Sequence, residues 1–238
     1  MATISDYVKY FNPALAGHRA WMTAALEQLV ALDPGALDEG GKLRQLWLAA
    51  EKPRPPAGGG KVLEVPYFSQ MDNEHDADGP AWRQCASSTC AMVAAYYGKV
   101  KNDEEYKDVR FKYGSTTNPN AHVSALRALG LDAELRQNAS LQDLKDEISA
   151  GRPVPVGWLH HGPTGAPTGG GHWSLVIGMR DGGSVHHDPY GRADLRHGGY
   201  ISRGVGDGRG IAYPHSQWVP RWNVKGNPPD GWMIVVKG

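Results

Sequence analysis

CASSTCAMVAAYY, the stretch from Cys85 to Tyr97, consists largely of small and apolar residues. Such a composition predicts a helix that packs inside a protein core. Gly98 follows the stretch, and glycine is the residue that most often ends a helix. We therefore expect a buried helix with Cys85 at its N-terminus.

Three more segments near this helix have patterns of regular structure. Upstream, Val62–Phe68 is apolar and partly alternating, which predicts a strand. Downstream, Ala121–Leu129 and Leu141–Ala150 have the spacing of amphipathic helices. We expect Ser140 to cap the second of these helices and Gly151 to end it.

The pattern changes to strands beyond residue 150. Four runs there are rich in β-branched and aromatic residues and are separated by glycine-dense turns. They are Val154–Leu159, Trp173–Met179, Ser184–His187 and Trp232–Val236. Helices followed by strands predict an α+β domain.

The first fifty residues, Met1–Ala50, form a separate predicted unit. Apolar residues recur there at helix-like spacing with a break at Asp33 and Pro34, which predicts a helical hairpin. Glu51–Gly60 (EKPRPPAGGG) combines charge, proline and glycine and is typical of a linker. The main domain is therefore expected over Lys61–Gly238, which is long enough for a well-buried core.

The overall charge favours neither nucleic acid nor an anionic membrane as a partner. Lysine plus arginine number 25 and aspartate plus glutamate number 25, so no net charge steers the chain toward polyanions. No stretch approaches the roughly 20 apolar residues that span a bilayer, so we expect no membrane insertion. The N-terminus lacks the basic start and apolar run of a secretory signal, so we expect synthesis in a cytoplasm.

Cys85 and Cys90 are the two cysteines of the chain. A thiol attacks a carbonyl as the thiolate, and the free N–H groups at a helix N-terminus stabilise that anion. Cys85 starts the predicted helix, whereas Cys90 lies more than one turn inside it, where this stabilisation has faded. Cys85 is therefore the preferred nucleophile, and two buried, inert thiols stay open as the alternative.

His172 and Asp188 are the residues expected to activate this nucleophile. Imidazole accepts a proton near neutral pH, and His172 follows three glycines at the start of the apolar strand WSLVIG. Asp188 ends the strand SVHH, and two adjacent antiparallel strands would bring it beside His172, where a carboxylate orients the ring. The alternative is that Asp188 only starts a turn with Pro189.

Acyl transfer also needs a hydrogen-bond donor for the oxyanion. Gln70, at the end of VPYFSQ, is the candidate, and Gln84 is the competitor. Gln70 is preferred because a side chain directly next to Cys85 usually points away from it. The low-complexity loop Gly162–Gly171 precedes His172, and it is either a flexible rim that admits a polymeric substrate or an ordinary surface loop.

No cofactor is expected, although some segments contain ligand-like residues. The acidic stretch Asp72–Asp78 resembles the start of a calcium loop, but the twelfth position counted from Glu74 is Cys85, so a structural calcium is a minor alternative. Neighbouring strand residues face opposite sides, which disfavours zinc at two histidine pairs. These pairs are His160–His161 and His186–His187.

Three tryptophans near the C-terminus have two interpretations. Core packing explains tryptophans in a β-rich domain most often, and stacking on the sugar rings of a glycan is the alternative. They are Trp218, Trp222 and Trp232.

Five blocks of the sequence together resemble the C39-like cysteine peptidases, which are papain-like domains of bacterial and phage-encoded proteins. In order, they are VPYFSQMDN, CASSTCAMVAAYYG, DEISAGRPVPVGW, GGGHWSLVIG and HHDPYG. The resemblance covers roughly Val62 to the C-terminus and implies a papain-like fold. It also implies the site residues, with Cys85 as nucleophile, His172 as base, Asp188 as its orienter and Gln70 as the oxyanion-hole amide.

Departures from the family pattern point to one branch of it. Many members have glycine and proline after the nucleophile, where this chain has Ala86 and Ser87. This polar helix start resembles the lysin-type branch, as in phage endolysins, and no transporter of the leader-processing members accompanies it. The resemblance therefore implies cleavage of peptidoglycan peptides, by an endopeptidase or an amidase, at the bacterial cell wall. A protein-processing protease and an inactive binding or virion protein on the same fold are the alternatives.

Overall fold

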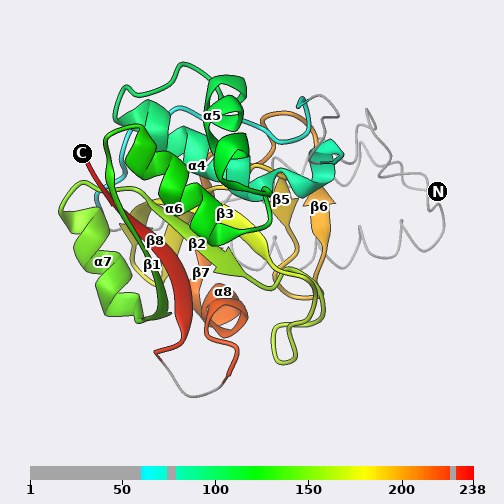
Figure 1. Ribbon diagram of the computed structural model, residues 1–238. Coiled ribbons are helices and arrows are strands. Elements are labelled where there is room, and N and C mark those ends of the chain that lie inside the picture. Colours follow the sequence, from blue (N-terminus) through cyan, green and yellow to red (C-terminus); the bar gives the residue numbers. More distant parts are fainter. Residues whose placement is uncertain (1–59, 74–78, 226–228) are drawn as a thin grey trace, which may run out of the picture. The chain divides into compact units, whose positions relative to one another are not determined.

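An antiparallel sheet of six strands lies at the centre of the part of the chain that the structure describes (Figure 1). This structure, a computed structural model, describes residues 60–73, 79–225 and 229–238, all within the unit Pro55–Gly238. In spatial order the strands are β1 (Asp132–Ala139), β8 (Gly231–Lys237), β2 (Val154–Trp158), β3 (His172–Arg180), β4 (Gly183–His187) and β7 (Ile211–Pro214).

A short hairpin and several helices complete the described elements. The hairpin pairs β5 (Arg192–Ala193) with β6 (Tyr200–Ser202). The α-helices are α4 (Cys85–Tyr96), α5 (Asp103–Arg110), α6 (Pro119–Ala128), α7 (Leu141–Ser149) and α8 (His215–Trp222), and the 3₁₀ helices are η1 (Ala81–Arg83) and η2 (Phe111–Tyr113). Within the described ranges, no helix is long and apolar enough to cross a membrane.

Alternating side chains of the sheet belong to two hydrophobic cores, one on each face. In β8, Ile234 and Val236 join the core formed with α4, α5 and α6, which we call the first core. Met233 and Val235 join the second core, formed with α7 and α8. Figure 1 shows these two groups of helices on opposite sides of the sheet. Because both faces are covered, the central strands are apolar at nearly every position.

Helix α4 runs through the first core and confirms the helix predicted over Cys85–Tyr97. Every residue from Ala86 to Ala94 is buried. A helix that is surrounded on all sides needs small side chains where its neighbours approach, and its alanine, serine and threonine residues meet that need. The helix therefore holds Cys85, its first residue, in a fixed place at the edge of the core.

Most other predicted elements are confirmed, with small changes at their ends. Ala121–Leu129 and Leu141–Ala150 correspond to α6 and α7, and Ser140 caps α7 in a reciprocal capping box with Asp143. The four strands predicted beyond residue 150 correspond to β2, β3, β4 and β8. Helices packed on one antiparallel sheet confirm the α+β class.

The strand predicted over Val62–Phe68 is wrong. Only Val62 forms a bridge, to Gly178 of β3, and the rest of the segment is extended without a ladder. Because β2 already occupies one edge of β3 as far as Val176, only a few residues of that edge remain free. The apolar side chains of the segment instead contribute to both cores: Leu63 belongs to the second core, Tyr67 and Phe68 pack against the first, and Val65 packs against both.

Two of the three tryptophans considered for glycan stacking belong to the second core. Trp218 and Trp222 are buried and stack on each other with ring centroids 5.1 Å apart. Core packing is therefore confirmed for both of them. Trp232 keeps 37% of its surface exposed.

Several predictions fall on residues that the structure does not describe. The helices of Met1–Ala50, the linker Glu51–Gly60 except its last residue, and residues 74–78 of the calcium-like segment lie outside the described ranges. The domain boundaries and the minor calcium alternative therefore remain predictions.

A buried arginine joins α8 to two loops. The Nε and Nη2 atoms of Arg221 donate to the Leu195 carbonyl at 2.9 and 2.7 Å. Nη1 donates to the carbonyls of Leu159 and His161, both at 3.1 Å, and Nη2 donates to that of Gly162 at 2.6 Å. One fully buried side chain thus satisfies carbonyls of the loop after β2 and of the β5–β6 hairpin.

We expect Arg221→Met to lower the free energy of unfolding by on the order of 3 kcal/mol, because it leaves several buried carbonyls without a donor. The urea midpoint, followed by tryptophan fluorescence, measures the loss. Arg196→Met on the same hairpin is the matched control, since the Arg196 side chain is exposed. Equal midpoints for the two variants would contradict the role assigned to Arg221.

Candidate active site

Cys85, His172 and Asp188 lie together at one end of the sheet. Because β3 and β4 are antiparallel neighbours that pair Leu175 with His187, the start of β3 lies beside the residue after β4. His172 Nε2 and Asp188 Oδ1 are 2.8 Å apart and hydrogen bonded. Cys85 lines the same pocket as His172, and Nδ1 is the ring nitrogen of His172 that Asp188 leaves free. The structure thus brings together three of the four expected site residues.

The carboxylate of Asp188 is held at both of its oxygens. Oδ1 accepts from the Tyr190 backbone N–H at 3.1 Å, and Oδ2 accepts from the Tyr213 hydroxyl at 3.0 Å. The backbone N–H of Asp188 donates to the Gly208 carbonyl at 2.9 Å. A Cβ atom on Gly208 would lie 1.8 Å from the Asp188 carbonyl oxygen, so this close approach requires glycine. Asp188 therefore does more than start a turn.

Opposing effects set the charge of His172. Burial, the largest effect, disfavours the charged ring, but the charge and the hydrogen bond of Asp188, together with Cys85, raise the pKa of His172 to about 10. The Trp158 ring meets the imidazole edge-on, at 5.3 Å and 87°, and helps to fix its plane. At neutral pH the imidazole is thus protonated, and an imidazolium beside Cys85 stabilises a thiolate.

Two further histidines lie beside His172 on the loop after β2. The rings of His160 and His161 are 4.0 Å apart, so the expectation that neighbouring histidines face opposite sides is wrong for this pair, which follows the end of β2. His160 lies 5.4 Å from His172 between ring centroids. Burial, and then the charge of His172, lower the pKa of His160 to about 3, so this ring is neutral. In the described ranges, no three metal-binding side chains gather into a cluster.

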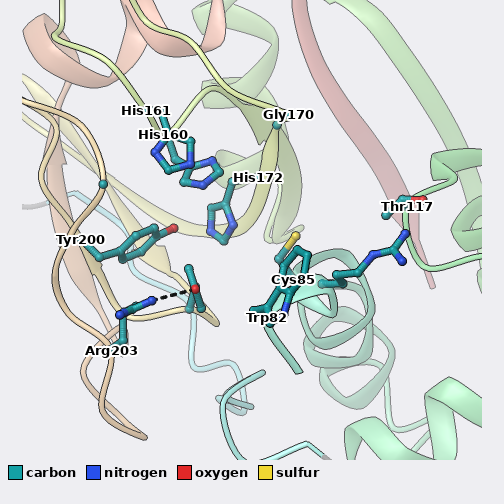
Figure 2. Close-up of a pocket in the computed structure, with 13 residues that line it drawn as sticks. Trp82, Cys85, Thr117, His160, His161, Gly170, His172, Tyr200 and Arg203 are labelled. Carbon is teal, nitrogen blue, oxygen red and sulfur yellow. Dashed lines mark hydrogen bonds between the residues drawn. The ribbon is translucent and has the colours of Figure 1, made fainter. Parts of the chain in front are cut away.

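A pocket of about 510 Å³ opens in front of these residues (Figure 2). Figure 2 shows His160, His161, His172 and Tyr200 on one side, with Cys85 and Trp82 facing them. The loop Gly162–Gly171 contributes its last two residues to the rim. The described lining residues are Trp82, Arg83, Cys85, Thr117, His160, His161, Gly170, Gly171, His172, Tyr190, Gly199, Tyr200 and Arg203.

Gln70 lies next to this arrangement without lining the pocket. Its side chain is fully buried, and Nε2 donates to the carbonyl of Ala81 in η1 at 3.1 Å. Its backbone N–H donates to the carbonyl of Pro189 at 2.9 Å, so Gln70 connects the segment before Cys85 with the loop after Asp188. Gln84, the competitor, is also buried and directly precedes α4. The oxyanion role of Gln70 stays a prediction.

Sequence reasoning missed the β5–β6 side of the pocket. Tyr190 and Tyr200 pack edge to face at 4.7 Å, and the Tyr200 ring lies 5.7 Å from that of His172. Tyr190 was within reach of prediction because it follows Asp188 in HHDPYG. Tyr200 belongs to a three-residue strand, β6, which is too short to produce an alternating pattern.

Comparison with known proteins gives a family match and several structural neighbours. The sequence model of the Peptidase_C39 like family matches residues 62–200. No curated protein sequence matches the chain. A putative C39-like peptidase from Bacillus anthracis is 16% identical with a TM-score of 0.52, and the alignment covers 76% of this chain and 98% of that one.

Two other solved structures have lower TM-scores. The peptidase domain of Streptococcus ComA, a bi-functional ABC transporter involved in quorum sensing, is 17% identical with a TM-score of 0.47 and coverage of 73% and 98%. A double glycine motif protease from an AMS/PCAT transporter, in complex with the leader peptide, is 18% identical with a TM-score of 0.42 and coverage of 77% and 96%.

Proposed function

Because this chain belongs to the Peptidase_C39-like family and has the papain-like fold, we propose that it hydrolyses peptide or amide bonds with Cys85 as the nucleophile. In this proposal His172 is the base and Asp188 orients it. The hydrogen-bonded pair of His172 and Asp188, with Cys85 facing His172 in the same pocket, is the observation that carries the proposal. It contains the nucleophile, base and orienting group that acyl transfer to a thiol requires.

The first half of the reaction forms an acyl-enzyme. The reaction starts from the ion pair in which His172 Nδ1 holds the proton of Cys85, and the thiolate attacks the carbonyl carbon of the scissile bond. The oxyanion accepts hydrogen bonds from the Cys85 backbone N–H, which has no acceptor within its own helix, and from the second Nε2 hydrogen of Gln70. The C–N bond then breaks, and the imidazolium gives its proton to the departing amine.

The second half of the reaction releases the acid. Neutral His172 takes a proton from water, the hydroxide attacks the thioester carbonyl, and the C–S bond breaks. The thiolate leaves beside the imidazolium, which restores the starting ion pair. Asp188 keeps Nδ1 directed at the reacting atoms in both halves, because it occupies Nε2.

Peptidoglycan peptides of the bacterial cell wall are the proposed substrate. The polar helix start, with Ala86 and Ser87 after the nucleophile, supports the lysin-type branch. In the structure Ser87 Oγ is hydrogen bonded to Thr116 Oγ1 at 2.8 Å, next to Thr117 in the pocket wall. The serine at this position therefore helps to place the segment that a substrate would meet.

Digestion of purified peptidoglycan, followed by mass spectrometry of the soluble products, tests this function. Cut stem peptides or cross-bridges would support an endopeptidase, and free intact stem peptides would support an amidase. The Cys85→Ala variant should release neither. Intact peptidoglycan together with Cys85-dependent cleavage of a protein substrate would overturn the cell-wall assignment in favour of protein processing.

A further inference from the structure

The described lining of the pocket beside Cys85 includes arginine side chains and no acidic one. None of its described lining residues is aspartate or glutamate, whereas two are arginines, Arg83 and Arg203. The chain as a whole is balanced, with 25 basic and 25 acidic residues. The excess is therefore local to the pocket, where a ligand of one charge would be selected at short range.

Arg203 is a cation that Tyr190 holds in place. Its Nη1 donates to the Tyr190 hydroxyl at 3.0 Å, and its guanidinium carbon lies 5.5 Å from the centre of the Tyr190 ring. These contacts occupy one N–H group and one face of the guanidinium. Among the ion pairs of the described residues, none includes Arg203. Its remaining donors are available to a ligand.

The same contacts place Arg203 near the reacting groups. The Tyr190 ring that supports it lies 6.3 Å from the His172 ring between centroids. The backbone N–H of Tyr190 is hydrogen bonded to Asp188. The arginine is thus separated from His172 by a single side chain, a distance that about three residues of an extended peptide would span.

Arg83 brings a second guanidinium from the side of the nucleophile. It is the last residue of η1, two positions before Cys85, and it is half-buried. Within the described part of the chain it too takes part in no ion pair. Trp82 beside it is 62% exposed and offers an apolar surface next to the charge.

We infer, on the premise that Cys85 is the nucleophile of a peptidase, that Arg83 and Arg203 select peptide substrates that carry a carboxylate close to the scissile bond. A guanidinium binds a carboxylate through two parallel N–H donors, which fixes both its position and its orientation. A substrate carboxylate held in this way would also offset the positive charge of the two arginines. Substrates in which the carboxylate is amidated should lose this recognition.

Alkylation of Cys85 with an anionic and a neutral reagent tests the inference without a known substrate. The rate ratio of iodoacetate to iodoacetamide, divided by the same ratio for glutathione, should exceed one in the native protein and fall as salt is added. Arg83→Gln and Arg203→Gln should each lower the ratio about threefold or more, because each removes one nearby positive charge. Arg196→Gln, an exposed arginine outside the pocket lining, should leave it unchanged.

The outcomes separate this inference from the catalytic proposal. If Cys85 reacts rapidly with iodoacetamide but the ratio is the same in all variants, the carboxylate inference is overturned and the peptidase proposal stands. If Cys85 reacts slowly with both reagents, the catalytic premise fails and the inference fails with it.

A second measurement uses catalysis. For one stem peptide with its carboxylate free or amidated, the native protein should prefer the free acid in kcat/KM by about tenfold, mainly through KM. In the double variant Arg83→Gln, Arg203→Gln, the two kcat/KM values should become similar, because only the value for the free-acid peptide falls. An equal loss for both peptides would show a structural effect of the substitutions and contradict selective recognition.

Discussion

Cys85→Ala is expected to reduce hydrolysis by at least about 10³-fold, because it removes the thiol that forms the acyl-enzyme. The half-exposed Cys85 starts α4 and lines the pocket beside His172. Release of peptides from purified peptidoglycan, or of amine from a protein substrate, measures the loss. The folded state of the variant is checked by its urea midpoint, which should stay close to that of the native protein.

Cys90→Ala is the matched control for this substitution. Cys90 is completely buried, and burial raises the pKa of its thiol to about 12, so it is a neutral core side chain. This variant should lose some stability through the vacated volume and keep its activity per folded molecule. An inactive Cys90→Ala beside an active Cys85→Ala would reverse the assignment of the nucleophile.

Asp188→Asn is expected to lower kcat/KM by about 10³-fold. The pH above which kcat/KM falls should also move to a lower value. Asp188 is the main reason that the pKa of His172 rises to about 10 against the effect of burial. Without the carboxylate, only Cys85 opposes the effect of burial on the pKa of His172, and the ring loses its proton at lower pH. The pH profile of kcat/KM should therefore fall near pH 10 in the native protein and roughly two or more units lower in the variant.

The same pair links stability to pH. Because the pKa of His172 is higher in the folded chain than in the unfolded one, its contribution to stability is complete below about 6.5 and is lost as the pH rises toward about 10. Asp188→Asn should remove this dependence. Asp194→Asn is the control, since Asp194 pairs with the exposed His197. If the pH above which kcat/KM falls is unchanged in Asp188→Asn, the role of Asp188 is contradicted.

The elements that the sequence predicted correctly are those with strong local patterns. Strands β2, β3 and β8 are buried on both faces and form continuous apolar runs, which are recognisable between glycine-rich turns. The edge strand β1 was missed because only Ala133 and Ala139 of its residues are buried, so DAELRQNA lacks an apolar run. Helix α8 was missed because Pro220 lies inside it.

Helix α5 was missed although its start carries a local signal. Asn102 accepts a hydrogen bond from the Glu105 backbone N–H, and three acidic residues occupy the first turn. Val62–Phe68 shows the opposite error, since its apolar alternation suits a strand but β3 has almost no free edge to pair with. Whether a strand has a free edge depends on the assembled sheet, so a local sequence pattern does not show it.

In the candidate site, too, local sequence patterns predicted some residues and missed others. Cys85 and His172 each begin a regular element, so local reasoning found both of them. The wall that faces Cys85 comes from the β5–β6 hairpin and from the loop that Arg221 fixes, segments that meet Cys85 only after more than 70 residues of intervening chain. The high pKa of His172 was also beyond local reasoning, because it depends on burial and on a carboxylate from the next strand.

The rate at which Cys85 reacts with iodoacetamide at neutral pH tests the central claim most directly. Cys90 serves as the internal reference, and peptide mapping of the alkylated protein gives both rates in one experiment. We predict that Cys85 reacts at least about 10²-fold faster than Cys90 and that His172→Ala abolishes most of this difference. If Cys85 reacts as slowly as Cys90, or equally fast with and without His172, the proposed thiolate–imidazolium pair of Cys85 and His172 is contradicted.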